Sequence, residues 1–208
     1  MKRKIFIIFI IILLILILFF VIRKIKNGNN ISNKSADEII EYILNIQSYE
    51  ADVTINITTN KTNNTYKAKQ QYLKNEKIYK QKITDDKYLD EMTICYNNET
   101  LTITNSKIEP AIIYNKYGEL IQNNLSLESF INDYNSNKNS TIEENNEYII
   151  LYVPKDDKNN VKSLYITKST NKISKMIIEN GTQKSTTYIE YNEIKINSLQ
   201  KEDILAFN

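Results

Sequence analysis

The residue types that carry most enzyme chemistry are scarce in this chain. Its 208 residues include no His and a single Cys, Cys95. Without His, the Ser–His and Cys–His nucleophile pairs and His-ligated metal sites are impossible. One thiol can form neither an internal disulfide nor a multi-thiolate metal site. Cys95 lies between Ile94 and Tyr96 in an apolar segment, which predicts a small buried side chain, with a reactive thiol as the alternative.

Paired carboxylates are the remaining acid–base groups, and three adjacent pairs occur: Asp85-Asp86, Glu143-Glu144 and Asp156-Asp157. Two carboxylates can hydrolyse a glycosidic bond when they flank it. Each pair, however, lies in polar, turn-like sequence, and neighbouring side chains in a strand point to opposite faces. We therefore predict solvated acids, no catalytic residues, no metal ligands and no cofactor.

The charge of the chain is divided unequally. Lys and Arg number 27 and Asp and Glu 25, for a formal charge of +2. The first 26 residues hold six of the basic residues and no acidic one, which leaves 21 basic and 25 acidic side chains, a charge of −4, in the remainder. Because a phosphate backbone requires clustered positive charge, we do not expect the chain to bind nucleic acid.

The N-terminus contains an apolar run long enough to cross a bilayer. From Ile5 to Ile22 every residue is Ile, Leu, Phe or Val, and eighteen helical residues reach about 27 Å, close to the roughly 30 Å of hydrocarbon. A cleaved secretory signal is the alternative, but no small-x-small cleavage pattern and no lipid-attachment cysteine follow the run. We predict an uncleaved signal anchor whose apolar positions include Ile5, Phe9, Leu13, Leu16, Phe20 and Ile22.

Basic residues flank the apolar run on both sides in nearly equal number, so the positive charge alone does not decide the orientation in the membrane. The N-terminal tail of four residues carries three cations and is expected to stay inside, while a long C-terminal body is exported regardless of its charge. We predict a single-pass cell-membrane protein with an extracytoplasmic body, and a cytoplasmic body is the alternative. The predicted organisation is a membrane anchor with basic flanks at 1–26, a polar spacer at 27–34 and one β-rich domain at 35–208.

A helix is expected directly after the spacer. Ser35 and Glu38 form a capping box, and Ile39, Ile43 and Ile46 then recur at helical spacing. Such an apolar stripe favours a helix packed on a sheet over a helix that binds a partner.

After this helix, apolar residues recur at every second position, which predicts strands. Val53, Ile55 and Ile57 alternate with polar residues in the first strand. Together with Ile39 and Ile43, they are candidates for a filled core or for an apolar cavity. Further strands are expected at 65–73, 77–83, 92–96, 100–104, 147–153, 161–168, 173–179 and 182–196, with a looser extended stretch through 112–114.

Turns and a second helix complete the pattern. Asn97-Asn98 and Asn180-Gly181 predict hairpin turns, a helix with Asn124 as a possible cap is expected through Tyr134, and 199–207 predicts a short helix or an apolar closing segment. Short connections favour antiparallel pairing. The expected class is α+β, one large curved antiparallel sheet covered by helices. A β-sandwich with peripheral helices is the alternative.

The residues also carry a resemblance to a known family. Segments 35–40 and 46–55, a capped helix that runs into a strand, resemble the opening of LolA-like lipoprotein-carrier domains. Segments 96–101, 124–130 and 180–182 resemble a strand pair, an inserted helix and a late hairpin of these domains. Within that superfamily the chain looks most similar to the germination lipoprotein GerS group of spore-forming bacteria.

This resemblance implies a half-open barrel capped by helices and no enzymatic activity. It further implies support of a cell-wall amidase during sporulation or germination, or binding of a lipid or lipoprotein acyl chain in an apolar cavity. The chain departs from the group because it lacks the lipid-attachment cysteine, and a fixed anchor would prevent it from ferrying cargo. We therefore expect a non-enzymatic binding or scaffold protein with an envelope protein partner, and lipid binding is the alternative.

Overall fold

The computed structural model describes residues 35–86, 89–115, 125–155 and 160–205. The chain divides into two units after Ile39. Of the first unit, the described part is the start of helix α2 (Ala36–Leu44). The predicted capping box is confirmed there: the Ser35 N–H donates to the Glu38 carboxylate at 2.8 Å, and the Glu38 N–H donates to the Ser35 hydroxyl at 3.4 Å.

The second unit contains eleven described strands. The first six are β1 (Ser48–Thr58), β2 (Asn63–Leu73), β3 (Ile78–Asp85), β4 (Met92–Asn97), β5 (Thr100–Asn105) and β6 (Ile108–Tyr114). The other five are β7 (Thr141–Glu144), β8 (Tyr148–Val153), β9 (Asn160–Thr167), β10 (Lys172–Asn180) and β11 (Ser185–Ile196). Helix α3 (Leu127–Ser136) lies between β6 and β7 in the chain, and α4 (Lys201–Leu205) follows β11.

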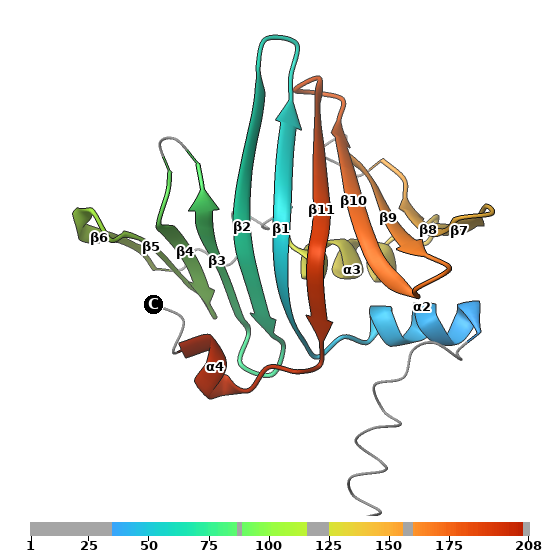
Figure 1. The fold of residues 1–208 in the computed structure, drawn as a ribbon, viewed down its shortest axis with the longest axis horizontal. Helices are drawn as coiled ribbons and strands as arrows, with labels where there is room; N and C mark the ends of the chain where they lie inside the picture. The colour runs from blue at the N-terminus through green and yellow to red at the C-terminus, as the bar shows by residue number, and fades with distance from the viewer. Residues whose placement is uncertain (1–34, 87–88, 116–124, 156–159, 206–208) are drawn as a thin grey trace, which may run out of the picture. The chain divides into compact units, whose positions relative to one another are not determined.

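All eleven strands form one antiparallel sheet that is open at both ends. Its order is β6-β5-β4-β3-β2-β1-β11-β10-β9-β8-β7, so β1 and β11 meet in the middle (Figure 1). The long central pair runs from Tyr49 opposite Ile196 to Thr58 opposite Thr186, with one irregularity after Asp52. The sheet is therefore two antiparallel meanders joined along a single pair of strands.

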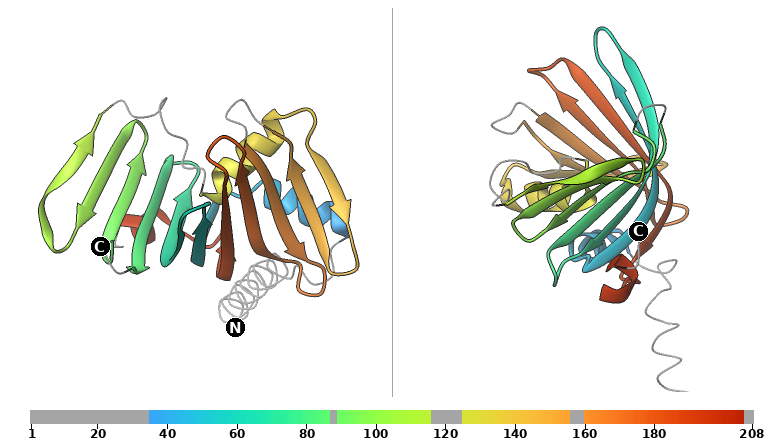
Figure 2. Two further views of the ribbon diagram at one scale, coloured as in Figure 1. Left: turned by 90° about the horizontal axis from the view of Figure 1, so that it is seen from above. Right: turned by 90° about the vertical axis from the view of Figure 1, so that its left-hand side faces the viewer.

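The sheet is curved, and α3 lies on its concave side (Figure 2). The residues that face this side follow from the register. Tyr49, Ala51, Val53 and Ile55 of β1 are buried, whereas Asp52 between them is exposed. The partners of the buried residues lie on the same face, because directly opposed residues share a face.

A row of aromatic residues crosses the concave face from the buried middle towards one edge. Tyr49 pairs with Tyr72, Tyr72 with Tyr79, and Tyr79 with Tyr96. The first three are buried and Tyr96 is half-buried. On the other half of the sheet, Leu151, Leu164, Met176 and Ile189 form a row of fully buried aliphatic side chains.

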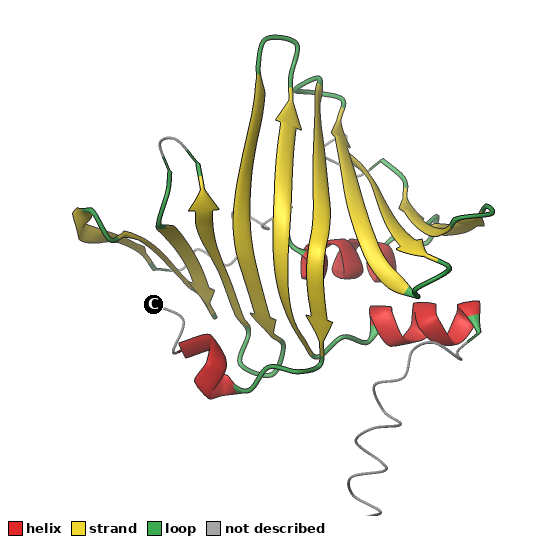
Figure 3. Cartoon of the chain, in the orientation of Figure 1, coloured by secondary structure: helices red, strands yellow, loops and turns green. Residues whose placement is uncertain are grey.

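Helix α3 completes the core of this unit. Leu127, Phe130 and Ile131 are buried, and its N-terminus is capped by the Ser126 hydroxyl, which accepts a hydrogen bond from the Ser129 N–H at 3.1 Å. The short helix α4 contacts β2 (Figure 3), and its Ile204 is buried. Of the described part of this unit, the sheet is thus the main element, and α3 and α4 are small beside it.

The predicted large curved antiparallel sheet is confirmed, and the described strands do not divide into the two sheets of a sandwich. Within the described ranges, no helix has the length and apolar character needed to span a bilayer. The predicted anchor positions Ile5, Phe9, Leu13, Leu16, Phe20 and Ile22 lie outside those ranges.

Several local predictions are wrong. The hairpin after Asn180 is a four-residue turn at 181–184, and its left-handed residue is Lys184 (φ 48°) rather than Gly181. The Asn180 side chain stabilises this turn by accepting from the Gln183 N–H at 2.7 Å. The cap of α3 is Ser126 instead of Asn124. Strand β7 was not predicted at all, because its four residues are too few to show a period.

Candidate functional site

The predicted core residues lie in different environments. Ile39, Ile43, Val53 and Ile55 are buried, and Ile57 is half-buried near the end of β1.

The acid pairs are spread over the sheet: Asp85 forms an exposed ion pair with Lys67 at 3.1 Å. Glu144 forms another with Lys168 at 2.8 Å, and Asp156-Asp157 lies outside the described residues. Cys95 is half-buried rather than fully buried, and burial raises the pKa of its thiol.

A small pocket opens beside α3 on the concave side. Tyr49, Tyr72, Glu128, Ile131 and Asn132 are among its lining residues. The pocket has a volume of about 20 Å³, and a single water needs roughly 10–15 Å³ by the same measure. The pocket can therefore hold a water molecule but is too small for an acyl chain.

Glu128 is the carboxylic acid among the residues that line this pocket. Desolvation by burial raises the pKa of its carboxyl group, and hydrogen bonds with the Asn132 and Tyr72 side chains oppose the rise. The Asn132 amide lies 3.3 Å from the carboxylate. The dominant cause is burial, so Glu128 is less stable as an anion here than in water.

Polar side chains on the concave face hold the start of α3. The amide nitrogen of Gln70 donates to Gln81 at 3.1 Å and to the carbonyl of Leu125 at 3.2 Å. The Tyr79 hydroxyl donates to the same Gln81 oxygen at 2.9 Å, and the Leu127 N–H donates to the Tyr49 hydroxyl at 3.3 Å. These buried polar groups therefore hold the start of α3 against the sheet.

A buried ion pair holds the other end of the same helix. Lys162 of β9 is 1% exposed, and its ammonium group contacts the Asp133 carboxylate and, at 3.2 Å, the Ser129 hydroxyl. Both partners belong to α3. A buried lysine requires such partners because the uncompensated charge is costly, so this cluster also has a structural explanation.

The strongest functional feature is an exposed apolar strand at the edge of the sheet. Seven large hydrophobic residues in the described ranges are exposed, and four of them belong to β6: Ile108 (66%), Ile112 (51%), Ile113 (60%) and Tyr114 (49%). We call these four residues the β6 surface. Large apolar side chains concentrated in one exposed segment are typical of a site that binds another molecule.

Strand β6 is also the end of the sheet. It pairs with β5, in which Leu101, Thr102 and Ile103 oppose Tyr114, Ile113 and Ile112, and no described strand pairs with its other side. Neighbouring side chains point to opposite faces, so Ile112 and Tyr114 lie on the concave face and Ile113 on the convex face. The β6 surface is apolar on both.

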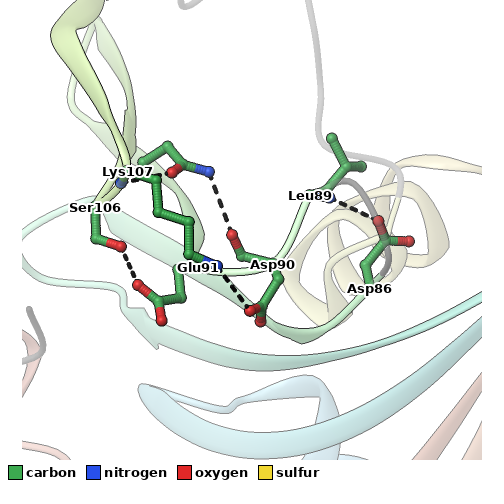
Figure 4. Close-up of polar contacts among 7 residues, drawn as sticks. Asp86, Leu89, Asp90, Glu91, Ser106 and Lys107 are labelled. Carbon is green, nitrogen blue, oxygen red and sulfur yellow. Dashed lines mark hydrogen bonds and ion pairs between the residues drawn. The ribbon is translucent and has the colours of Figure 1, made fainter.

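The hairpin that begins β6 is held in place by a cluster of polar contacts (Figure 4). The Lys107 ammonium group forms an ion pair with Asp90 at 3.3 Å, and the Ser106 hydroxyl donates to Glu91. Asn105 donates to the Asp90 carbonyl at 3.3 Å. The loop between β3 and β4 therefore fixes the turn between β5 and β6.

The sequence alone did not identify the β6 surface. The sequence predicts only a looser extended stretch at 112–114, because Ile112, Ile113 and Tyr114 are consecutive and do not alternate with polar residues. One sequence feature could have indicated this surface: residues 111–115, which follow Pro110, carry no charge. That pattern fits a strand that meets a partner on both faces.

Comparison with known proteins provides the context of this fold. The chain is similar to an uncharacterized conserved protein from Thermus thermophilus, with 11% identity, a TM-score of 0.53, and coverage of 84% of this chain and 95% of the other. It is similar to a LolA superfamily protein from Nitrosomonas europaea, with 12% identity, a TM-score of 0.42, and coverage of 81% and 96%.

A third similar structure is that of the CwlD amidase from Clostridioides difficile in complex with the GerS lipoprotein. The identity is 17% and the TM-score 0.42, and the match covers 81% of this chain and 96% of the other. At these identities the likeness concerns the fold. No curated protein matches the sequence, whereas the family model described as "Sporulation protein YdcC-like" matches residues 3–205.

Proposed function

Since the chain belongs to the YdcC-like sporulation proteins, we propose that it is a non-enzymatic, membrane-anchored binding protein of the cell envelope in sporulating cells. Its β6 surface docks a protein partner. The anchor is the apolar run from Ile5 to Ile22, and the sheet lies outside the cytoplasm.

The concentration of exposed apolar residues on β6 is the observation that carries this proposal. Four large hydrophobic side chains exposed on one edge strand are a liability unless they are covered by a partner. The opposite edge, β7, has one such residue, Ile142 (46%), beside Glu143 and Glu144. The two edges therefore differ in chemistry, and β6 is the one suited to binding.

The class of partner comes from the resemblance of the sequence to the GerS group, which implies support of a cell-wall amidase. A protein without His, and with its acid pairs dispersed, is better suited to holding such an enzyme than to hydrolysing the wall itself. A fixed membrane anchor suits a scaffold, because it keeps the partner near the membrane.

Co-purification from sporulating cells tests this function. The tagged full-length chain is extracted in mild detergent, and recovered amidase is quantified by mass spectrometry. We expect amidase with the wild type and with the Ile142→Asp control on the opposite edge. The double variant Ile112→Asp, Ile113→Asp should recover at least roughly tenfold less, since two hot-spot contacts each contribute about 1–2 kcal/mol. Absence of amidase with the wild type, or equal recovery with the double variant, would refute the proposal.

Binding of a lipid or acyl chain is the second candidate function. It is favoured by Ile94, Tyr96 and Ile103, which are only half-buried on the concave face of β4 and β5. Native mass spectrometry of the full chain, released from detergent, tests it. A co-purifying lipid that is lost in Ile103→Asp would support this candidate, and a lipid-free wild type would exclude it.

A further inference from the structure

We infer that a cluster of polar contacts at the start of β6 positions the β6 surface and thereby sets how tightly it binds its partner. This inference rests on the proposed function and adds the control of the same site. The cluster joins the loop between β3 and β4 to the turn between β5 and β6, and we call it the β6 clamp. Its members are Asp90 and Glu91 of the loop and Asn105, Ser106 and Lys107 of the turn. They are positioning residues, which act on the partner through β6.

The start of β6 is the part of the strand that its pairing with β5 holds least. The register between the two strands is regular at 112–114 and then shifts before Asn105 pairs with Ile108. The shift falls at 109–111 of β6, and Pro110 among these residues has no N–H to donate. On the other side of β6, no described strand pairs with it. Contacts outside the ladder are therefore needed to hold this end of the strand.

The β6 clamp supplies these contacts. The side-chain oxygen of Asn105 accepts from the Lys107 N–H at 2.8 Å, which shapes the turn, and its amide nitrogen donates to the Asp90 carbonyl at 3.3 Å. Two side-chain contacts reinforce this link. The Lys107 ammonium group lies 3.3 Å from the Asp90 carboxylate, and the Ser106 hydroxyl donates to Glu91 (Figure 4). These contacts cross from the turn to the loop and fix their relative position.

The loop side of the clamp is itself attached to the core. The Glu91 N–H donates to the carbonyl of Ile83 at 3.0 Å, and Ile83 of β3 is 2% exposed. The N–H of Met92, the first residue of β4, donates to the carbonyl of Leu89 at 2.9 Å. The clamp therefore connects the buried part of the sheet to the start of its edge strand.

The clamp contributes to binding more than to the stability of the domain. The side chains of Lys107 and Asp90 are 62% and 40% exposed, and exposed ion pairs add little to the free energy of unfolding. An edge hairpin can open locally at a lower free energy than the whole domain, so loss of the clamp loosens β6 while the rest of the sheet stays folded. A partner that binds the loosened strand has to order it first, which weakens binding.

A double-mutant cycle on the tagged full-length chain tests this inference. The three clamp variants carry alanine on the loop side, on the turn side, and on both sides: Asp90→Ala with Glu91→Ala, Ser106→Ala with Lys107→Ala, and all four together. The matched control is Asp85→Ala, which removes another exposed ion pair, that with Lys67 at 3.1 Å. Three quantities are measured for each protein: the amidase recovered from sporulating cells, hydrogen exchange at 108–114 in the purified chain, and the midpoint of urea unfolding.

We expect the loop-side and turn-side variants each to recover at least about threefold less amidase than the wild type, since each removes an ion pair and a hydrogen bond. The quadruple variant should recover about as much as either of them, because the two sides act through the same contacts. Amides at 108–114 should exchange faster in all three clamp variants, at an unchanged urea midpoint. The control Asp85→Ala should match the wild type in recovery and in exchange.

Other results would overturn the inference, and each has a distinct meaning. Wild-type recovery or unchanged exchange in the clamp variants would show that β6 is positioned without these contacts, and the proposed function would stand. Losses that multiply in the quadruple variant would mean that the clamp side chains touch the partner directly. A lower urea midpoint in the clamp variants would assign the contacts to the stability of the fold. A wild type that recovers no amidase would overturn the proposed function, and this inference with it.

Discussion

Glu128 shows how a residue on the rim of the core differs from one in solution. Its carboxyl group accepts hydrogen bonds from Asn132 and Tyr72, yet burial raises its pKa above the usual value of 4.5. The anion is therefore destabilised by its surroundings in spite of its partners. Folding is easier when this group carries a proton.

The resulting pH dependence can be measured. A raised pKa means that the folded state holds the proton more tightly than the unfolded state, so stability falls as pH rises from about 4.5 through the raised pKa. Glu128→Gln keeps an acceptor for Tyr72 without the charge, and it should unfold at higher urea concentration than the wild type at pH 8. The two unfolding midpoints should converge near pH 4. A constant difference across this range would contradict the assignment.

Residue-level detail was the least predictable from the sequence. Lys162 occupies a strand position that any alternation rule assigns to the core, and only the position of Asp133 on α3 explains why a lysine is tolerated there. Gln70 and Gln81 are buried for a similar reason: Gln70 donates a hydrogen bond to Gln81 and another to the carbonyl of Leu125. Contacts between residues far apart in the chain leave no local pattern.

At the scale of elements, α3 is held on the sheet by polar contacts at both ends and apolar contacts between them. Leu125 and Leu127 are bound near its start by Gln70 and Tyr49, and Asp133 contacts Lys162 further along. The helix is fixed in position by these contacts, since its apolar face alone would allow it to slide.

Removal of one partner of the buried ion pair should be costly. Asp133→Ala deprives the buried Lys162 of its carboxylate, which we expect to lower the free energy of unfolding by about 3 kcal/mol. The control Asp85→Ala removes an exposed partner of Lys67, and its effect should be much smaller. Urea unfolding of the two variants compares them. Equal effects would mean that the Lys162–Asp133 pair contributes no more than a surface contact.

Most elements were predictable because their signals are local. The sequence shows the Ser35–Glu38 capping motif directly. It also shows the alternation of the strand from 51 to 58 and the helical spacing of the helix through Tyr134. Strand β7 has too few residues for a period, and β6 has apolar residues on both faces, which removes the alternation. The sequence did not reveal the β6 surface because its apolar residues lie on both faces of the strand, and their exposure on both faces is also what makes it a candidate site.

At the scale of the whole molecule, the proposed location depends on the N-terminal run. Arg near the middle of a membrane helix costs roughly 2.5–3.5 kcal/mol on insertion scales. We therefore expect the double variant Leu13→Arg, Leu16→Arg to leave the membrane pellet on alkaline extraction, whereas Leu13→Ile, Leu16→Ile stays with it. Immunoblots of the two fractions measure this, and equal retention of both variants would contradict the anchor.

The orientation is tested in the same cells. Protease added outside intact protoplasts should degrade the sheet domain of the wild type and leave a cytoplasmic marker intact. A protected domain would place the body in the cytoplasm.

The pairing of β1 with β11 has a consequence for how the chain reaches its final form. Tyr49 meets Ile196, so one of the two strands in the middle of the sheet is the last of the described strands to be synthesised. Each meander is built from near neighbours, but joining them closes a loop of nearly the entire domain, which is entropically expensive and slow. A ribosome or export channel that releases the chain from its N-terminus therefore exposes the unpaired edge of β1 until the end. The protein completes its fold only after its last strand has emerged, and a chaperone would protect it best by occupying β1 during that interval.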